Sequence, residues 1–234
     1  MDNENNYKTL CDALNNYTDL WNKGLKKKAN AYIDDFVKSF FEKLDKNSSD
    51  ELLYRFCLEF CDQNKHDNLK KRGNLPHELN RIVWEYLKEN CILNRMPHMR
   101  YIYQIYGRYH NPFNRYLEFD ICSTLKKAYE HKQCDDKTVC LYFNEQLNYL
   151  SWGMHHFPDS CIITKQTYIE LVNEAEKIIS EHTVPQNLID DLNYFKNIYE
   201  IYFNFEKNGK TDDFYKLCSD AGIEFEQIPT FYYL

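Results

Sequence analysis

Apolar residues recur at three- and four-residue spacing through most of this chain, and glycine and proline rarely interrupt them. In the run 168–182, one helical face carries Tyr168, Leu171, Val172, Ala175, Ile178, Ile179 and His182. The 234 residues include only 6 glycines and 6 prolines, too few for the many tight turns of a β-sandwich or barrel. The pattern therefore predicts an all-α fold, an irregular bundle of about eight to nine helices joined by short loops.

Breaks in this spacing place the predicted helices at 7–22, 26–44, 50–61, 76–93, 113–130, 139–154, 168–182, 185–208 and 212–220. The polar run 63–74 is predicted as an exposed connection, and the aromatic run 96–115 as a segment broken by Gly107 and Asn111-Pro112. No glycine- or proline-rich linker separates the helices. We therefore expect one domain over residues 1–234, with a weak subdivision near 131–137.

Nine cysteines are spread over nearly the whole length: Cys11, Cys57, Cys61, Cys91, Cys122, Cys134, Cys140, Cys161 and Cys218. Proteins of the reducing cytosol rarely keep so many unless they bind a metal, so the count favours disulfides that hold the bundle together. The odd number leaves at least one thiol without a partner in the chain. Buried, reduced thiols remain the alternative.

The charge and the motifs disfavour several functional classes. A net charge of −7 argues against binding nucleic acid, and the scattered glycines form no phosphate-binding loop. No stretch is apolar enough to cross a membrane, and the first ten residues are too polar for a signal peptide. Cys57, Cys61 and His66 could hold a metal, but no second pair completes the site. We therefore predict no metal, no cofactor and no enzymatic activity.

One segment differs in charge from the rest of the chain. The run 95–117 has four arginines and no acidic residue, and five tyrosines are interleaved with them. Arginine and tyrosine are enriched among the residues that dominate binding energy at protein interfaces. The candidate partner-binding residues are Arg95, Arg100, Tyr103, Arg108, Tyr109 and Arg115. The alternative is an ordinary helix that buries Ile102, Ile105 and Tyr106 and points its arginines to water.

Two stretches of the second half resemble a known family. Residues 139–144 (VCLYFN) and 147–150 (LNYL) resemble the Cys-x-Tyr-Leu-Asn-Tyr-Trp segment of the Plasmodium interspersed repeat proteins, which include the VIR proteins. Residues 192–205 look like the late Leu-Lys-x-Leu-Tyr-x-Tyr helix of that family, and Cys218 resembles its following cysteine. The family's Tyr-Trp is here Tyr149-Leu150, with Trp152 two places later. The likeness covers mainly residues 134–220.

This resemblance implies the ectodomain of a variant surface antigen of a malaria parasite, exported to the infected red blood cell. Its expected partner is a host cell-surface protein or immune receptor, bound in adhesion or immune evasion without catalysis. The resemblance also implies a membrane anchor, a C-terminal helix that this sequence does not contain, and we expect a monomer. Two other hypotheses stay open: an intracellular helical adaptor with reduced cysteines, and a metal-dependent enzyme with histidine and cysteine ligands.

Overall fold

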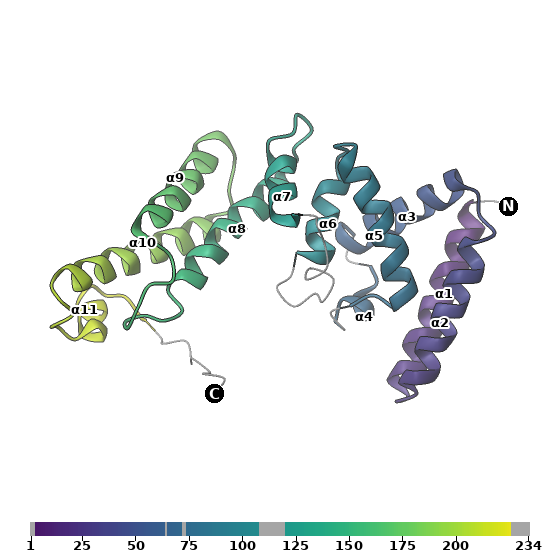
Figure 1. Ribbon diagram of the computed structural model, residues 1–234, viewed down its shortest axis with the longest axis horizontal. Helices are drawn as coiled ribbons and strands as arrows, with labels where there is room; N and C mark the ends of the chain where they lie inside the picture. Colours follow the sequence, from purple (N-terminus) through teal and green to yellow (C-terminus); the bar gives the residue numbers. More distant parts are fainter. Residues whose placement is uncertain (1–2, 64, 72–73, 108–119, 226–234) are drawn as a thin grey trace. The chain divides into compact units, whose positions relative to one another are not determined.

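The computed structural model describes residues 3–63, 65–71, 74–107 and 120–225, and every regular element in these ranges is an α-helix (Figure 1). The helices are α1 (Asn3–Asn22), α2 (Lys26–Phe41), α3 (Lys46–Cys61), α4 (Asp67–Lys70), α5 (His77–Ile92), α6 (His98–Tyr106), α7 (Ile121–Tyr129), α8 (Asp136–Gly153), α9 (Lys165–Glu181), α10 (Gln186–Lys207) and α11 (Phe214–Asp220). The all-α prediction is therefore confirmed. Within these ranges no helix combines the length and the apolar character that a bilayer crossing requires.

The described part holds eleven helices, more than the eight or nine predicted, because two short helices lie in segments expected to be irregular. One is the single turn α4 in the polar run 63–74. The other is α6, which occupies the residues between Pro97 and Gly107. Met99, Ile102 and Tyr106 are buried at helical spacing on α6, so packing against neighbouring helices stabilises a segment too short to be recognised by its period alone.

Side-chain caps begin five of the helices. At the N-termini of α3, α7, α8, α9 and α11, a side-chain oxygen accepts a hydrogen bond from the backbone N–H three residues later; the capping residues are Asp45, Asp120, Asp135, Thr164 and Asp213. Such a cap typically stabilises a helix by about 1 kcal/mol. The sequence pattern had predicted that α3 starts within 47–50, whereas Asp45 caps it and α3 begins at Lys46.

The chain divides into two compact units, residues 1–131 (unit 1) and residues 132–234 (unit 2). In unit 1, α1 packs against α2, and α2 and α3 contact α5, which in turn packs against α6 (Figure 1). Fully buried Leu10, Ile33, Phe56 and Leu79 come from four of these helices. They belong to one continuous apolar core that holds unit 1 together.

Unit 2 is built around α10, which contacts α8, α9 and α11. Its core is aromatic: the rings of Phe157 and Tyr202 stack with centroids 3.9 Å apart, and the hydroxyl of Tyr199 donates a hydrogen bond to the carbonyl of Leu150 at 2.8 Å. Gly153, the last residue of α8, allows this packing. A Cβ at that position would lie 2.1 Å from the Tyr199 hydroxyl and 2.7 Å from Cγ1 of Ile163.

All nine cysteines lie among the described residues, and the structure joins no two of them in a disulfide. The structure therefore shows the helical bundle but not the disulfides that were predicted to hold it. Cys57, Cys91 and Cys218 are buried, and they pack as small apolar side chains in the cores. Burial raises the pKa of each of these three thiols, to about 12 for Cys91, so they stay protonated at neutral pH.

Candidate functional site

The six residues predicted to bind a partner fall into two groups. Arg95, Arg100 and Tyr103 lie in the described residues, whereas Arg108, Tyr109 and Arg115 lie outside them. Arg95 is exposed on the turn before α6, Tyr103 is half-buried on α6, and Arg100 is buried. The structure thus gives three surroundings to three residues that the sequence pattern had treated alike.

Arg100 belongs to the interior of unit 1, where only 2% of its side chain is exposed. Its two terminal nitrogens donate hydrogen bonds to the two carboxylate oxygens of Asp62, at 2.6 and 2.9 Å. The hydroxyl of Tyr101 donates a further hydrogen bond to Asp62 at 2.8 Å. Because Asp62 is the C-cap of α3, this bidentate ion pair joins α3 to α6. The assignment of Arg100 to an exposed partner-binding surface is corrected: its guanidinium pairs with an interior carboxylate.

Arg95 lies on the turn that ends α5. The backbone N–H of Asn94 donates to the carbonyl of Cys91, and that of Arg95 to the carbonyl of Asn90, both at 3.0 Å. Asn94 has a positive φ of 52°, so the turn has the pattern of a Schellman motif with asparagine in the place usually taken by glycine. The Arg95 side chain also donates to the Asn90 side-chain oxygen at 3.0 Å. Backbone and side-chain bonds together hold Arg95 in one orientation on the surface.

Two large apolar side chains are exposed immediately before Arg95. Ile92 is 64% exposed and Leu93 is 54% exposed, and both exceed the exposure of Trp152, at 47%. Neighbouring Cys91 is buried, so the apolar side chains change from buried to exposed between one residue and the next. Ile92, Leu93 and Arg95 are called the α5–α6 corner below.

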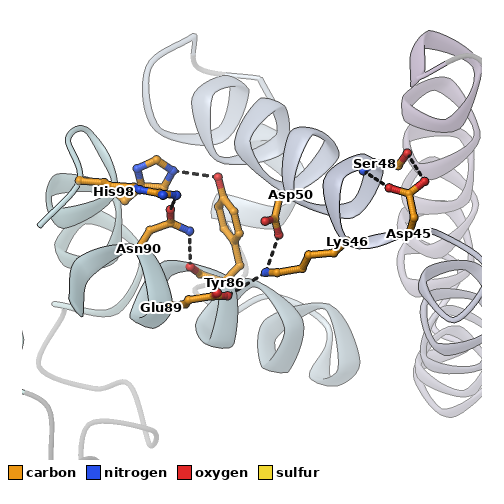
Figure 2. A network of polar contacts seen from close by, with 9 residues as sticks. Asp45, Lys46, Ser48, Asp50, Tyr86, Glu89, Asn90 and His98 are labelled. Carbon is orange, nitrogen blue, oxygen red and sulfur yellow. Dashed lines mark hydrogen bonds and ion pairs between the residues drawn. The ribbon is translucent and has the colours of Figure 1, made fainter. Parts of the chain in front are cut away.

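A buried histidine supports the α5–α6 corner from behind. His98, the first residue of α6, has its Nε2 2.8 Å from the hydroxyl of Tyr86 on α5 (Figure 2). Its ring also packs against Tyr54 of α3. Burial, together with the positive charge of Arg95, lowers the pKa of His98 to about 4. The ring is therefore neutral at physiological pH. From α6 it contacts α5 through the hydrogen bond to Tyr86 and α3 through its packing against Tyr54.

A lysine bridges the same helices nearer the solvent. Lys46 Nζ lies 2.8 Å from a carboxylate oxygen of Asp50 and 2.7 Å from one of Glu89, so it links the first turn of α3 to the end of α5 (Figure 2). These hydrogen bonds raise the pKa of Lys46. The three side chains are 36–60% exposed, and such pairs contribute little to stability. Their effect is to restrain the end of α5, which leads into the α5–α6 corner.

A second polar cluster, around Glu59, accounts for a residue that had suggested a metal site. His66 Nε2 lies 3.3 Å from the hydroxyl of Tyr7 and 3.8 Å from Glu59, while Cys57 points into the core. Burial acts to raise the pKa of Glu59, but hydrogen bonds from Lys65, Tyr7 and other groups outweigh it and lower this pKa. Among the described residues, no three or more His, Cys, Asp or Glu side chains are arranged to hold a metal ion.

Sequence reasoning missed the two apolar residues of the α5–α6 corner. A signal is present for Ile92, which falls outside the spacing of the buried positions of α5. Leu93 gives no such signal, because it follows buried Asn90 by three positions and buried Tyr86 by seven. Large apolar residues outside the buried face of a helix form either a second buried face or an exposed patch. Only the exposed fraction of their side chains in the folded structure distinguishes the two.

Comparison of the chain with protein-family models, with curated proteins and with solved structures gives no match.

Proposed function

We propose that this chain is a non-catalytic binding domain that contacts another protein through the α5–α6 corner. The observation that carries the proposal is the exposure of Ile92 and Leu93, each more than half exposed, beside the oriented guanidinium of Arg95. The buried centre of a protein interface is more apolar than the rest of the surface, and arginine is enriched there. Because the corner is held by backbone and side-chain hydrogen bonds, little conformational entropy is lost when it binds.

The class of binding domain comes from the resemblance to the Plasmodium interspersed repeat proteins. On that basis we propose a variant surface antigen ectodomain, exported to the infected red blood cell and anchored through a C-terminal helix outside this sequence. Its partner would be a host cell-surface protein or immune receptor, and its role adhesion or immune evasion. What supports this is the pair of similar segments, which lie in α8 and α10, two helices that pack against each other in unit 2.

The cysteines distinguish this proposal from a second one. A surface antigen works in an oxidising environment, and we propose that some of its thiols form disulfides there. An intracellular adaptor of the parasite would keep them reduced, so the oxidation state of the thiols in the cell separates the two functions. Both functions use the α5–α6 corner. Counting free thiols by mass spectrometry, on protein taken from the parasite and alkylated without reduction, decides between them: seven or more favours the adaptor, and fewer favours the antigen.

A cell-binding experiment tests the proposed function. The purified chain, labelled with a fluorophore, is added to human red cells, leukocytes and endothelial cells, and its binding is measured by flow cytometry. Leu93→Glu and Arg95→Glu should each reduce binding at least about tenfold, the loss expected when a residue central to an interface is replaced. Arg81→Glu, at an exposed position of α5, is the matched control and should bind normally. Binding that survives both corner variants would refute the site, and no binding to any of the cells would count against the antigen proposal.

A further inference from the structure

A cavity of about 550 Å³ lies within unit 2, where the loop before α9 meets the last turn of α10. One side is formed by residues 161–165 and the other by Phe203, Asn204, Glu206 and Lys207. This volume is within the range of roughly 300–1,000 Å³ that small-molecule sites occupy. Ile162, Ile163 and the ring of Phe203 form the apolar half of the lining, and the polar half includes the ammonium groups of Lys165 and Lys207.

The walls of the cavity are fixed by hydrogen bonds that do not involve a ligand. The backbone N–H of Ile162 donates to the carbonyl of Gly153 at 2.9 Å, and the Cys161 thiol lies 3.6 Å from the same oxygen. On the other side, the N–H of Asn208 donates to the carbonyl of Asn204 at 3.0 Å. The cavity is therefore already formed before any ligand arrives, which lowers the entropic cost of binding.

The two lysines stand out against the charge of their unit. Unit 2 contains 8 lysines, no arginine and 17 acidic residues, a net charge of −9, whereas unit 1 carries +2. In the part of the chain that the structure describes, no carboxylate pairs with Lys165 or Lys207. Glu206 is the acidic residue of the lining, and its carboxylate accepts a hydrogen bond from Tyr202 at 3.4 Å. The cavity thus has two cations available in a unit that otherwise repels anions.

We infer that this cavity binds a small aromatic or acyl carboxylate. The apolar part of the ligand would pack against Phe203 and Ile163, and the carboxylate would accept hydrogen bonds from the ammonium groups of Lys165 and Lys207. Lys165 already lies with its Nζ 5.4 Å from the centroid of the Phe203 ring, so a cation and an aromatic face stand side by side. A neutral or cationic ligand of the same shape gains the apolar contacts but not the charge-assisted hydrogen bonds. The inference does not depend on the α5–α6 corner, which belongs to unit 1.

Cys161 provides a reporter within the cavity. The thiol is half-buried in the lining, and Cys122 on α7 of unit 1 is an exposed reference. The intact, reduced protein is treated with N-ethylmaleimide at mildly alkaline pH, and the alkylation rate of each cysteine is followed by mass spectrometry of its peptide. Naphthoate should slow alkylation of Cys161 in a saturable manner and leave Cys122 unchanged. Calorimetric titration with naphthoate gives the affinity independently.

Three comparisons decide the result. Lys165→Glu/Lys207→Glu should weaken naphthoate binding at least about tenfold, because the ligand loses two charge-assisted hydrogen bonds. Lys177→Glu, an exposed lysine of α9 outside the lining, makes half the charge change and should bind normally. Naphthylmethylammonium, of similar shape and opposite charge, should protect Cys161 at least about tenfold less. Equal protection by both compounds, unchanged affinity in the double variant, or no heat and no protection with naphthoate would each overturn the inference.

Discussion

Replacing Arg100 by methionine tests whether this arginine is a structural residue. Methionine keeps an unbranched apolar side chain of comparable length but removes the guanidinium. The substitution deletes two hydrogen bonds to Asp62 and one, of 2.9 Å, to Gln104. It leaves the Asp62 carboxylate without its counter-charge in a place where its side chain is 12% exposed.

The expected loss follows from this burial. Breaking a buried ion pair by removing one partner typically costs 3–5 kcal/mol, because the remaining charge is left uncompensated. Asp62 keeps the hydroxyl of Tyr101 and some contact with water, so we expect a value near the lower end, about 3 kcal/mol. For a unit of 131 residues that corresponds to a fall in Tm of about 11 °C. Asp62→Leu/Arg100→Met should recover part of the loss, since no buried charge then remains.

Urea unfolding followed by tryptophan fluorescence measures this effect in unit 1. Trp84 is buried against Tyr106 in unit 1, and a Trp152→Phe background removes the fluorescence of unit 2. Arg81→Met is the control, because Arg81 is 55% exposed and its pair with Glu78 lies on the surface, so we expect at most about 0.5 kcal/mol. Arg100→Met should lower the free energy of unfolding more than Arg81→Met does, and the double variant should lose less than the sum of Asp62→Leu and Arg100→Met. If either expectation fails, the ion pair does not hold α3 to α6.

Three further predictions follow from the packing and the protonation of buried groups. Gly153→Ala should destabilise unit 2 by about 3 kcal/mol in chemical unfolding, because the new methyl group overlaps the Tyr199 hydroxyl, and Gly153→Ala/Tyr199→Phe should lose less than the sum of the single variants. The pKa of His98 is about 4 in the folded chain and about 6.5 in the unfolded chain, so the unfolded chain binds the proton more readily. The free energy of unfolding of unit 1 should therefore fall by up to about 3 kcal/mol as the pH falls from 6.5 to 4. His98→Gln should reduce this pH dependence, measured by chemical unfolding across that range. In reduced protein, Cys122 should be alkylated first and Cys57 only on unfolding; equal rates by mass spectrometry would contradict the burial of Cys57.

The fold class could be predicted because helical spacing is local. The positions of α8, α9 and α10 followed from apolar residues three and four apart, and the end of α10 from the Asn208-Gly209 pair. The structure starts α8 and α9 three residues before the predicted positions, directly after the caps Asp135 and Thr164. The short helix α6 was kept only as an alternative for its segment, because its stability comes from contacts with α3, α5 and α7, which no window of local sequence contains. Whether the cysteines pair could not be predicted, for a different reason. Cysteine number favours disulfides statistically, but a buried thiol also packs as a small apolar residue.

Arg95 and Arg100 show why the candidate site could be predicted only in part. Both are arginines in the same acid-free run, and the sequence gives them the same local context. What separates them is Asp62, which lies 38 positions before Arg100 and reaches it because α3 and α6 pack together. An acid-free run is therefore no sign that its arginines lack acidic partners. Arg95 stays at the surface because its partner, Asn90, is a neighbour in the same turn.

The resemblance to the Plasmodium interspersed repeat proteins rests on residues that form the core of unit 2, and this limits what it can say about binding. Tyr142, Phe143 and Tyr199 lie in the similar segments, and all three are buried. Residues of this kind specify how helices pack, so a likeness in them bears on the fold of unit 2 and not on a surface. Both surfaces proposed to bind lie instead where helices end, at residues 92–95 and at 161–165 with the last turn of α10. Chain at helix ends can change without repacking a core, and binding residues concentrate there in many folds. The recognition properties of this chain are therefore to be sought at these helix ends, with the cores serving to hold them in place.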